Sequence, residues 1–192
     1  MLTICVTGGL GSGKSLACEI FYNLGCEIFD ADIEAKMILF SNPDVKFGLV
    51  DRFGKKILNQ GKIDKKTLSK LIFSDIQNQQ FLNNLVHPLV IQKFLSQKIN
   101  VKKSIYIMDA ALLFEANIQD HFDKTILIFT GQHLRLKRAI KRGNLSHEQI
   151  LSRMALQMPE DEKRKLASII IDNNGTIDEL TDKIIGLYHD LV

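Results

Sequence analysis

The sequence lacks the long apolar segments and the cysteine patterns that mark several classes of protein. No apolar run approaches the ~20 residues that cross a bilayer, so we expect no membrane association. The first residues lack the basic and apolar regions of a secretory signal, which predicts a cytoplasmic protein. The three cysteines are odd in number and lack CxxC spacing, which excludes a disulfide framework and a zinc ribbon and favours buried free thiols.

The sequence also lacks a strong charge of one sign. A formal net charge of +3 is too small to indicate a polyanion such as DNA, so we expect no nucleic-acid partner, although local basic clusters could hold a small phosphorylated ligand. With 192 residues, 45% of them hydrophobic, the chain has the size and composition of one soluble domain, with or without a small insertion.

Five apolar runs rich in β-forming residues alternate with helical patterns. This alternation predicts an α/β fold whose five-stranded parallel sheet is covered on both faces. The runs are 2–7, 26–30, 104–109, 124–130 and 168–172. Helical periodicity fills the gap between the second and third runs and is interrupted at His87-Pro88, which predicts a helical insertion. Further helices are predicted at 132–142, 146–157, 159–167 and 177–190.

The stretch GGLGSGKS follows the first predicted strand and precedes a helical pattern. Gly8, Gly13, Lys14 and Ser15 satisfy G-x-x-x-x-G-K-[ST], which predicts a phosphate-binding loop. Glycines let successive backbone N–H groups point at phosphate oxygens, helped by the following helix N-terminus. Lys14 would add charge near the β- and γ-phosphates, and the Ser15 hydroxyl would bind Mg²⁺. The alternative is a glycine-rich turn that matches by chance.

Carboxylates follow two of the predicted strands. Asp30 and Asp32 end the second strand, at the edge where parallel sheets carry their ligands. A carboxylate there could accept a proton from an attacking hydroxyl or hold Mg²⁺ through water, but either residue could also cap the next helix. Asp109 ends the third strand, where it would support Mg²⁺ or serve as an ordinary structural carboxylate.

A basic cluster lies between the fourth and fifth predicted strands. On a helix, Arg135, Arg138 and Arg142 share one face, because they stand at i, i+3 and i+7. Such a helix could close over transferring phosphates and exclude water. The alternative is a solvated basic face.

Together these residues resemble the dephospho-CoA kinase family over nearly the whole chain. The phosphate loop is generic, but the further motifs, in this order and spacing, are specific. They are LG-x4-DAD, FG-x3-L-x2-G, L-x3-IF, HP at His87-Pro88, LLFE at 112–115, R-x3-R at Arg138 and Arg142, R-x3-Q at 153–157 and DNNG at 172–175.

The resemblance implies a P-loop NTPase fold of three layers with three parts. These are a nucleotide-binding core (about 1–32, 103–131 and 167–192), a helical substrate-binding insertion (about 33–102) and a small helical lid (about 132–166). It implies ATP-dependent phosphorylation of the ribose 3′-hydroxyl of dephospho-CoA, the last step of coenzyme A synthesis, with Mg²⁺. We expect a monomer or a weak oligomer.

The resemblance also implies roles for matching residues. The catalytic set would be Asp32, the base that orients the substrate hydroxyl, with Lys14, Arg138 and Arg142 stabilising the transferring phosphoryl group. Dephospho-CoA would lie near Asp32, His87, Leu112, Leu113 and Glu115, although His87 could equally be a packed histidine ahead of a proline. ATP would be held by Gly9, Gly11, Ser12, Gly13, Lys14, Ser15, Leu16, Asn173 and Asn174, and Mg²⁺ by Ser15 and Asp109.

Some positions depart from the family pattern, and two other functions stay open. Leu16 stands where a threonine is common, Ala111 where a proline is usual and Ser168 where an acid is expected, and none of these removes a reacting group. One alternative is a P-loop kinase for a nucleoside or nucleotide. The other is a GTPase-type switch, although the sequence lacks the N-K-x-D run that reads guanine.

Overall fold

The computed structural model describes residues 1–73 and 75–192, without the side chain of Phe73 of the L-x3-IF motif. The chain divides into two compact units. The first comprises Met1–Asp30 and Asn100–Val192, and the second comprises Ala31–Ile99. Among the described residues, no helix has the length and apolar character that crossing a membrane requires.

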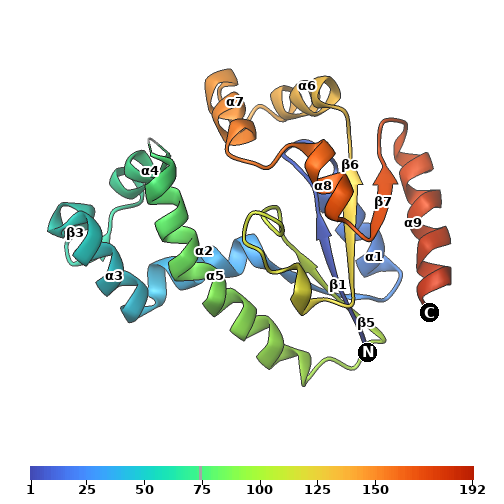
Figure 1. The fold of residues 1–192 in the computed structure, drawn as a ribbon, viewed down its shortest axis with the longest axis horizontal. Coiled ribbons are helices and arrows are strands. Elements are labelled where there is room, and N and C mark those ends of the chain that lie inside the picture. The colour runs from blue at the N-terminus through green and yellow to red at the C-terminus, as the bar shows by residue number, and fades with distance from the viewer. Residues whose placement is uncertain (74) are drawn as a thin grey trace. The chain divides into compact units, whose positions relative to one another are not determined.

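The first unit is built on a five-stranded parallel sheet (Figure 1). The strand order is β2-β5-β1-β6-β7. The α/β fold with five parallel strands is therefore confirmed. The strands are β1 (Leu2–Thr7), β2 (Glu27–Asp30), β5 (Ile105–Asp109), β6 (Lys124–Phe129) and β7 (Ile169–Asp172).

Helices cover both faces of this sheet, which is why its strands are almost continuously apolar. Ile4, Ile107 and Ile126 point to the face that packs under α1 (Lys14–Asn23) and α9 (Ile177–Leu191). On the opposite face, α8 (Glu160–Leu166) contacts β6, and the Arg164 guanidinium lies 4.5 Å from the centre of the Phe129 ring.

The strand order places a topological switch point at the carboxyl ends of β1 and β6. The chain leaving β1 passes through α1 to β2 on one side of the sheet, whereas the chain leaving β6 reaches β7 on the other. Open parallel sheets bind ligands in the crevice at such a point. Beyond the end of β6 lie α6 (Gln132–Arg142) and α7 (His147–Ala155), as Figure 1 shows.

The helices near this edge have well-defined ends. A capping box on Ser146 starts α7 and another on Thr176 starts α9, so side chains satisfy first-turn N–H groups. Gly143, at φ 70°, ends α6 in the left-handed conformation that favours glycine. The 3₁₀ turn η2 (Gln119–His121) precedes β6.

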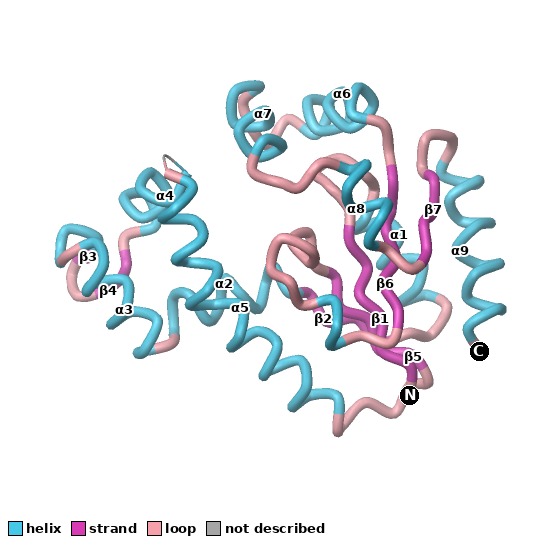
Figure 2. Tube along the Cα trace, in the orientation of Figure 1, coloured by secondary structure: helices cyan, strands magenta, loops and turns pink. Residues whose placement is uncertain are grey.

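The second unit is mainly helical (Figure 2). Buried apolar side chains, among them Val45, Leu49, Val90 and Phe94, form its interior. Its elements are α2 (Ala31–Ser41), α3 (Pro43–Phe53), η1 (Lys55–Ile57), β3 (Leu58–Asn59), β4 (Lys62–Ile63), α4 (Lys65–Phe73) and α5 (Ile76–Lys98).

Two local features of the second unit differ from the sequence prediction. The helix α5 runs through Pro88 without a break, although proline removes one backbone hydrogen bond. Buried Val86 and Val90 flank it, so packing compensates for the lost bond. The β3–β4 hairpin was not predicted. Its turn residues Gln60 (φ 48°) and Gly61 (φ 75°) both have the positive φ of a type I′ turn.

Candidate functional site

The glycine-rich loop between β1 and α1 has a backbone that only glycine allows at two positions. Gly11 has φ 83° and Gly13 has φ 94°. A Cβ atom at Gly11 would lie 2.3 Å from the Arg135 carbonyl oxygen, and one at Gly13 would lie 2.2 Å from Asn173 Nδ2. Close neighbours and positive φ together therefore explain these two glycines.

Side chains from distant parts of the first unit hold the loop. The Ser12 carbonyl accepts hydrogen bonds from Asn173 Nδ2 at 2.7 Å and from Thr130 Oγ1 at 3.0 Å. The Leu10 N–H donates to Gln157 Oε1 at 2.9 Å, and the Leu10 carbonyl accepts from Arg135 Nε at 3.1 Å. The ends of β6 and β7 and the α6–α8 segment thus fix the loop from different sides.

The N-terminus of α1 opens directly onto this loop. Gly13 is its N-cap and has no side chain with which to satisfy the first-turn N–H groups. These donors and the positive end of the helix dipole favour an anion. Lys14, the first helical residue, forms an ion pair with Asp109, which ends β5. The arrangement suits a bound phosphate next to a lysine whose position is fixed.

The residues predicted to hold Mg²⁺ offer the right type of donor. Ser15 is exposed on the first turn of α1, and Asp109 contributes a carboxylate at the end of β5. Mg²⁺ prefers such oxygen ligands and, when carried by a nucleotide, needs only one or two from the protein. Within residues 1–73 and 75–192, no group of three or more His, Cys, Asp or Glu side chains is arranged to hold a metal ion on its own.

A cleft of ≈ 400 Å³ lies beside the loop. It brings together six of the predicted site residues and adds a lysine and an isoleucine. Its lining consists of Gly11, Gly13, Leu16, Arg138, Lys141, Arg142, Asn173 and Ile177. Three basic side chains and no acidic one line this space, so it suits a polyanionic ligand with an apolar part.

The two arginines of the cleft have different surroundings. Arg138 donates from Nη1 to the Asn173 carbonyl at 2.9 Å and from Nη2 to the Gly175 carbonyl at 3.4 Å. Arg142, near the end of α6, is exposed. The 173–175 turn is further tied to the end of β6, because the Gly131 N–H donates to Asn174 Oδ1 at 2.9 Å. Arg138 therefore braces the turn, whereas Arg142 is an exposed residue that lines the cleft.

The third arginine of α6, Arg135, does not line the cleft. The i, i+3, i+7 spacing predicted one basic face, but Arg135 is buried and directed at Leu10 and Glu160. Its Nη1 lies 2.8 Å from Glu160 Oε1. Burial raises the pKa of Glu160, although the positive charges of Arg135 and Lys163 oppose this rise.

The LLFE segment after β5 lies largely inside the first unit. Leu113 is fully buried and Leu112 is half-buried. Glu115 Oε1 accepts a hydrogen bond from the Met158 N–H at 2.8 Å and lies 2.9 Å from Lys163 Nζ. Lys163 is fully buried, and its Nζ also donates to the Ala111 carbonyl at 3.4 Å. The sequence analysis missed Lys163, because the strongly charged stretch EDEKRKL indicates a solvated helix.

Two predicted site residues, Asp32 and His87, lie in the second unit, whereas the phosphate loop belongs to the first unit. Asp32 is exposed in the first turn of α2, where a carboxylate also stabilises the helix start. His87 is half-buried in α5. In the first unit, Asp30 ends β2 and pairs in register with Asp109 of β5.

The three cysteines are buried, and one of them lies in the same helix as the loop lysine. Cys18 follows Lys14 by one helical turn, and burial raises its pKa, with the Asp109 carboxylate adding to the rise. Burial also raises the pKa of Cys26 to about 11. Cys5 is buried as well, so the expectation of buried free thiols is confirmed and none is suited to act as a nucleophile.

Comparison with known proteins identifies the family. The dephospho-CoA kinase family profile matches residues 2–179. A dephospho-CoA kinase of Chlorobaculum tepidum is 36% identical over 199 residues, covering 100% of this chain and 95% of the relative. The solved dephospho-CoA kinase of Campylobacter jejuni is 29% identical with a TM-score of 0.69, covering 98% of this chain and 96% of that one. A solved Thermus thermophilus protein reaches a TM-score of 0.83 at 28% identity, covering 100% and 98% of the two chains. A phosphate loop at the switch point, the basic cleft beside it and these matches agree, and the chain belongs to the dephospho-CoA kinase family.

Proposed function

We propose that this chain transfers the γ-phosphate of ATP to the ribose 3′-hydroxyl of dephospho-CoA, giving coenzyme A. Its family membership supports the reaction and the acceptor. The observation that carries the proposal within the structure is the basic cleft that joins the phosphate loop to the 173–175 turn. A cleft of this composition suits a nucleotide whose phosphates lie on the loop and whose base reaches the turn.

ATP would bind to residues of the first unit. Backbone N–H groups from Gly11 to Leu16 would surround the phosphates, with Ser12 fixed by its bonded carbonyl. The turn at Asn173 and Asn174 would border the adenine. Leu16 and Ile177 supply the apolar lining that a nucleobase needs.

Three cations would act on the transferring phosphoryl group. Lys14 would reach the β- and γ-phosphates from the first turn of α1. Arg142, which is exposed beside the cleft, is free to extend toward the γ-phosphate as α6 closes, and Arg138 would act from the braced turn. Their charges would balance the negative charge that develops on the equatorial and leaving oxygens.

Asp32 would be the base of the reaction. Its carboxylate would accept the proton of the 3′-hydroxyl as the hydroxyl oxygen forms a bond to the γ-phosphorus. The bond between that phosphorus and the β–γ bridging oxygen breaks, and ADP leaves. Asp32 also orients the hydroxyl for in-line attack, which lowers the entropy cost of the step.

The residues that would contact or shape the acceptor site are His87, Leu112, Leu113 and Glu115. His87 belongs to the helical second unit, whereas Leu112, Leu113 and Glu115 belong to the segment after β5. Leu113 is fully buried and Glu115 is bonded to Met158 and Lys163. These two residues would therefore support the side chains that line the acceptor pocket. Leu112, which is half-buried, is placed to touch the acceptor directly.

The Ser15 hydroxyl and the Asp109 carboxylate would hold Mg²⁺, which neutralises charge on the β- and γ-phosphates when it is bound. Asp109 would at the same time keep Lys14 in position through their ion pair. We further infer a cytoplasmic enzyme, monomeric or weakly associated, that acts on small molecules and has no nucleic-acid partner. Its net charge of +3 agrees with this inference.

The test is Asp32→Asn compared with wild type, with dephospho-CoA as acceptor. Because a general base contributes at least ~10²-fold to the rate, kcat should fall by that factor while the Kd for ATP stays near the wild-type value. Asp44→Asn is the matched control, since Asp44 is another exposed acid in the first turn of a second-unit helix. A fully active Asp32→Asn enzyme would refute the role of Asp32.

A further inference from the structure

Both backbone polar groups of Leu10, within the phosphate loop, are bonded to side chains from the α6–α8 segment. The N–H donates to Gln157 Oε1, and the carbonyl accepts from Arg135 Nε. With these bonds in place, the Leu10 N–H and carbonyl are occupied by protein partners and are not available to a phosphate. The bonds also set the orientation of the peptide planes that lead into Gly11.

Arg135 itself is fixed on every side. Its side chain is 6% exposed and that of its ion-pair partner Glu160 is 9% exposed. A Cβ atom at Gly9 would lie 2.5 Å both from Arg135 Cζ and from Glu160 Oε1, so the loop backbone packs directly on this pair. The Arg135 carbonyl oxygen likewise lies against Gly11. The guanidinium therefore has one orientation, in which it donates to Leu10.

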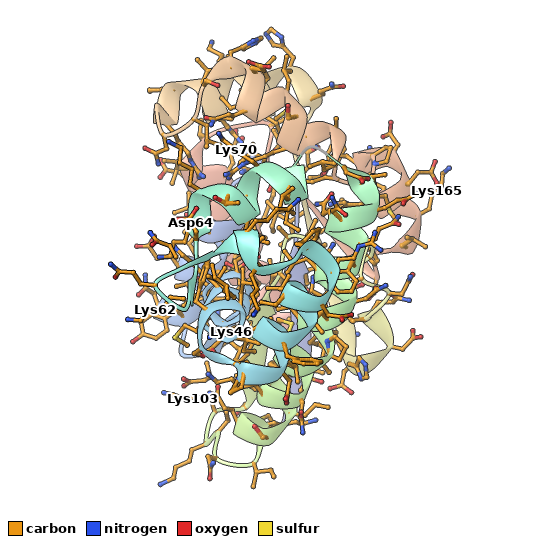
Figure 3. All side chains as sticks on the ribbon, turned by 90° about the vertical axis from the view of Figure 1, so that its left-hand side faces the viewer. Lys46, Lys62, Asp64, Lys70, Lys103 and Lys165 are labelled. Atoms are coloured by element: carbon orange, nitrogen blue, oxygen red, sulfur yellow. The ribbon has the colours of Figure 1, made fainter. Side chains whose placement is uncertain are left out.

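Two other charges on the same helices are exposed instead. Lys137 on α6 is exposed, and the Lys165 side chain on α8 is 69% exposed and extends away from the ribbon (Figure 3). Taking a guanidinium and a carboxylate out of water carries a large desolvation cost, and a buried ion pair is weak evidence for added stability. The buried pair is better explained by the geometry that it imposes on the loop.

We propose that Arg135, held by Glu160, acts with Gln157 as a positioning unit that keeps the phosphate loop in its binding shape before ATP arrives. The unit touches no reacting atom. Because the loop is ordered during folding, ATP does not have to order it on binding, and the affinity for ATP rises accordingly. The inference rests on the proposed binding of ATP at this loop and adds residues that the sequence analysis did not include in the site.

The experiment measures the Kd for ATP without acceptor, and then kcat and both KM values, for three variants. Arg135→Met removes the donor, Gln157→Ala removes the second bond, and the double variant Arg135→Met/Glu160→Met removes the whole ion pair. Each should raise the Kd and KM for ATP by roughly 10-fold or more, as expected for losing a hydrogen bond to a charged or buried group, and leave the KM for dephospho-CoA unchanged. Lys137→Gln removes one charge from the same helix and should change neither the Kd nor the KM for ATP.

The double variant separates positioning from folding. Arg135→Met alone leaves Glu160 buried without its partner and can lose stability, whereas the apolar pair should restore the melting temperature and not the ATP affinity. A folded double variant that binds ATP as tightly as wild type would overturn the proposal, as would wild-type affinity in Gln157→Ala. A wild-type protein that binds ATP but does not phosphorylate dephospho-CoA would defeat the proposed function and leave this inference standing.

Discussion

Gly13→Ala is the substitution whose effect on the nucleotide site the structure defines most fully. Gly13 has φ 94°, a conformation that costs an L-residue about 1–2 kcal/mol. The new methyl group would stand 2.2 Å from Asn173 Nδ2, a buried amide that donates to the Ser12 carbonyl. Displacing this amide loses a hydrogen bond and leaves a buried donor unsatisfied, which destabilises the folded state by about 1–3 kcal/mol. The free energy of unfolding should therefore fall by about 2–5 kcal/mol.

Gly25→Ala is the matched control for this prediction. Gly25 has nearly the same φ, 99°, at the other end of α1, and a Cβ atom there would meet nothing within 4 Å. Its substitution should cost only the conformational part, about 1–2 kcal/mol, and leave the Kd for ATP unchanged. Urea denaturation gives both stabilities, and titration with ATP gives both affinities. Equal destabilisation by the two substitutions, with equal ATP binding, would refute the reasoning.

The remaining predictions concern stability. Gly186→Ala should raise the free energy of unfolding by about 0.5–1 kcal/mol in urea denaturation, because Gly186 lies inside α9 with open space around its missing Cβ. Since burial raises the pKa of Glu160 above its ordinary 4.5, the folded protein binds this proton more readily than the unfolded chain. The contribution of Glu160 to the free energy of unfolding should thus decline as the pH rises from below 4.5 through the folded-state pKa. Glu160→Gln should remove this part of the pH dependence. A Glu160→Gln protein with the same pH dependence as wild type would contradict this assignment.

The sheet and the phosphate loop could be predicted from the sequence because both leave local signals. Strands that are buried on both faces must be apolar along their length, so the runs mark the ends of β1, β5 and β6 to within one residue. The loop requires glycine wherever φ is positive or another backbone lies close, as at Gly11 and Gly13. Such requirements appear in a single short stretch of residues.

The partners of the charged side chains could not be predicted, because they depend on contacts between distant segments. Lys163 is paired with Glu115, and Arg135 is paired with Glu160, although both basic residues lie in stretches that have the composition of solvated helices. Helical spacing places Arg135 beside Arg138 along the helix, but it does not reveal that Arg135 is buried against the phosphate loop and Glu160 while Arg138 is half-buried beside the cleft. Burial of single charges is decided by the packing of whole elements.

The central claim is that this chain phosphorylates dephospho-CoA at its 3′-hydroxyl with ATP. Purified protein given ATP labelled in the γ-phosphate should transfer the label to dephospho-CoA and yield coenzyme A, identified by mass and by its 3′-phosphate. Nucleosides and nucleoside monophosphates should receive little or no label under the same conditions. Transfer of the label to a nucleoside or to AMP, with dephospho-CoA left unmodified, would contradict the account.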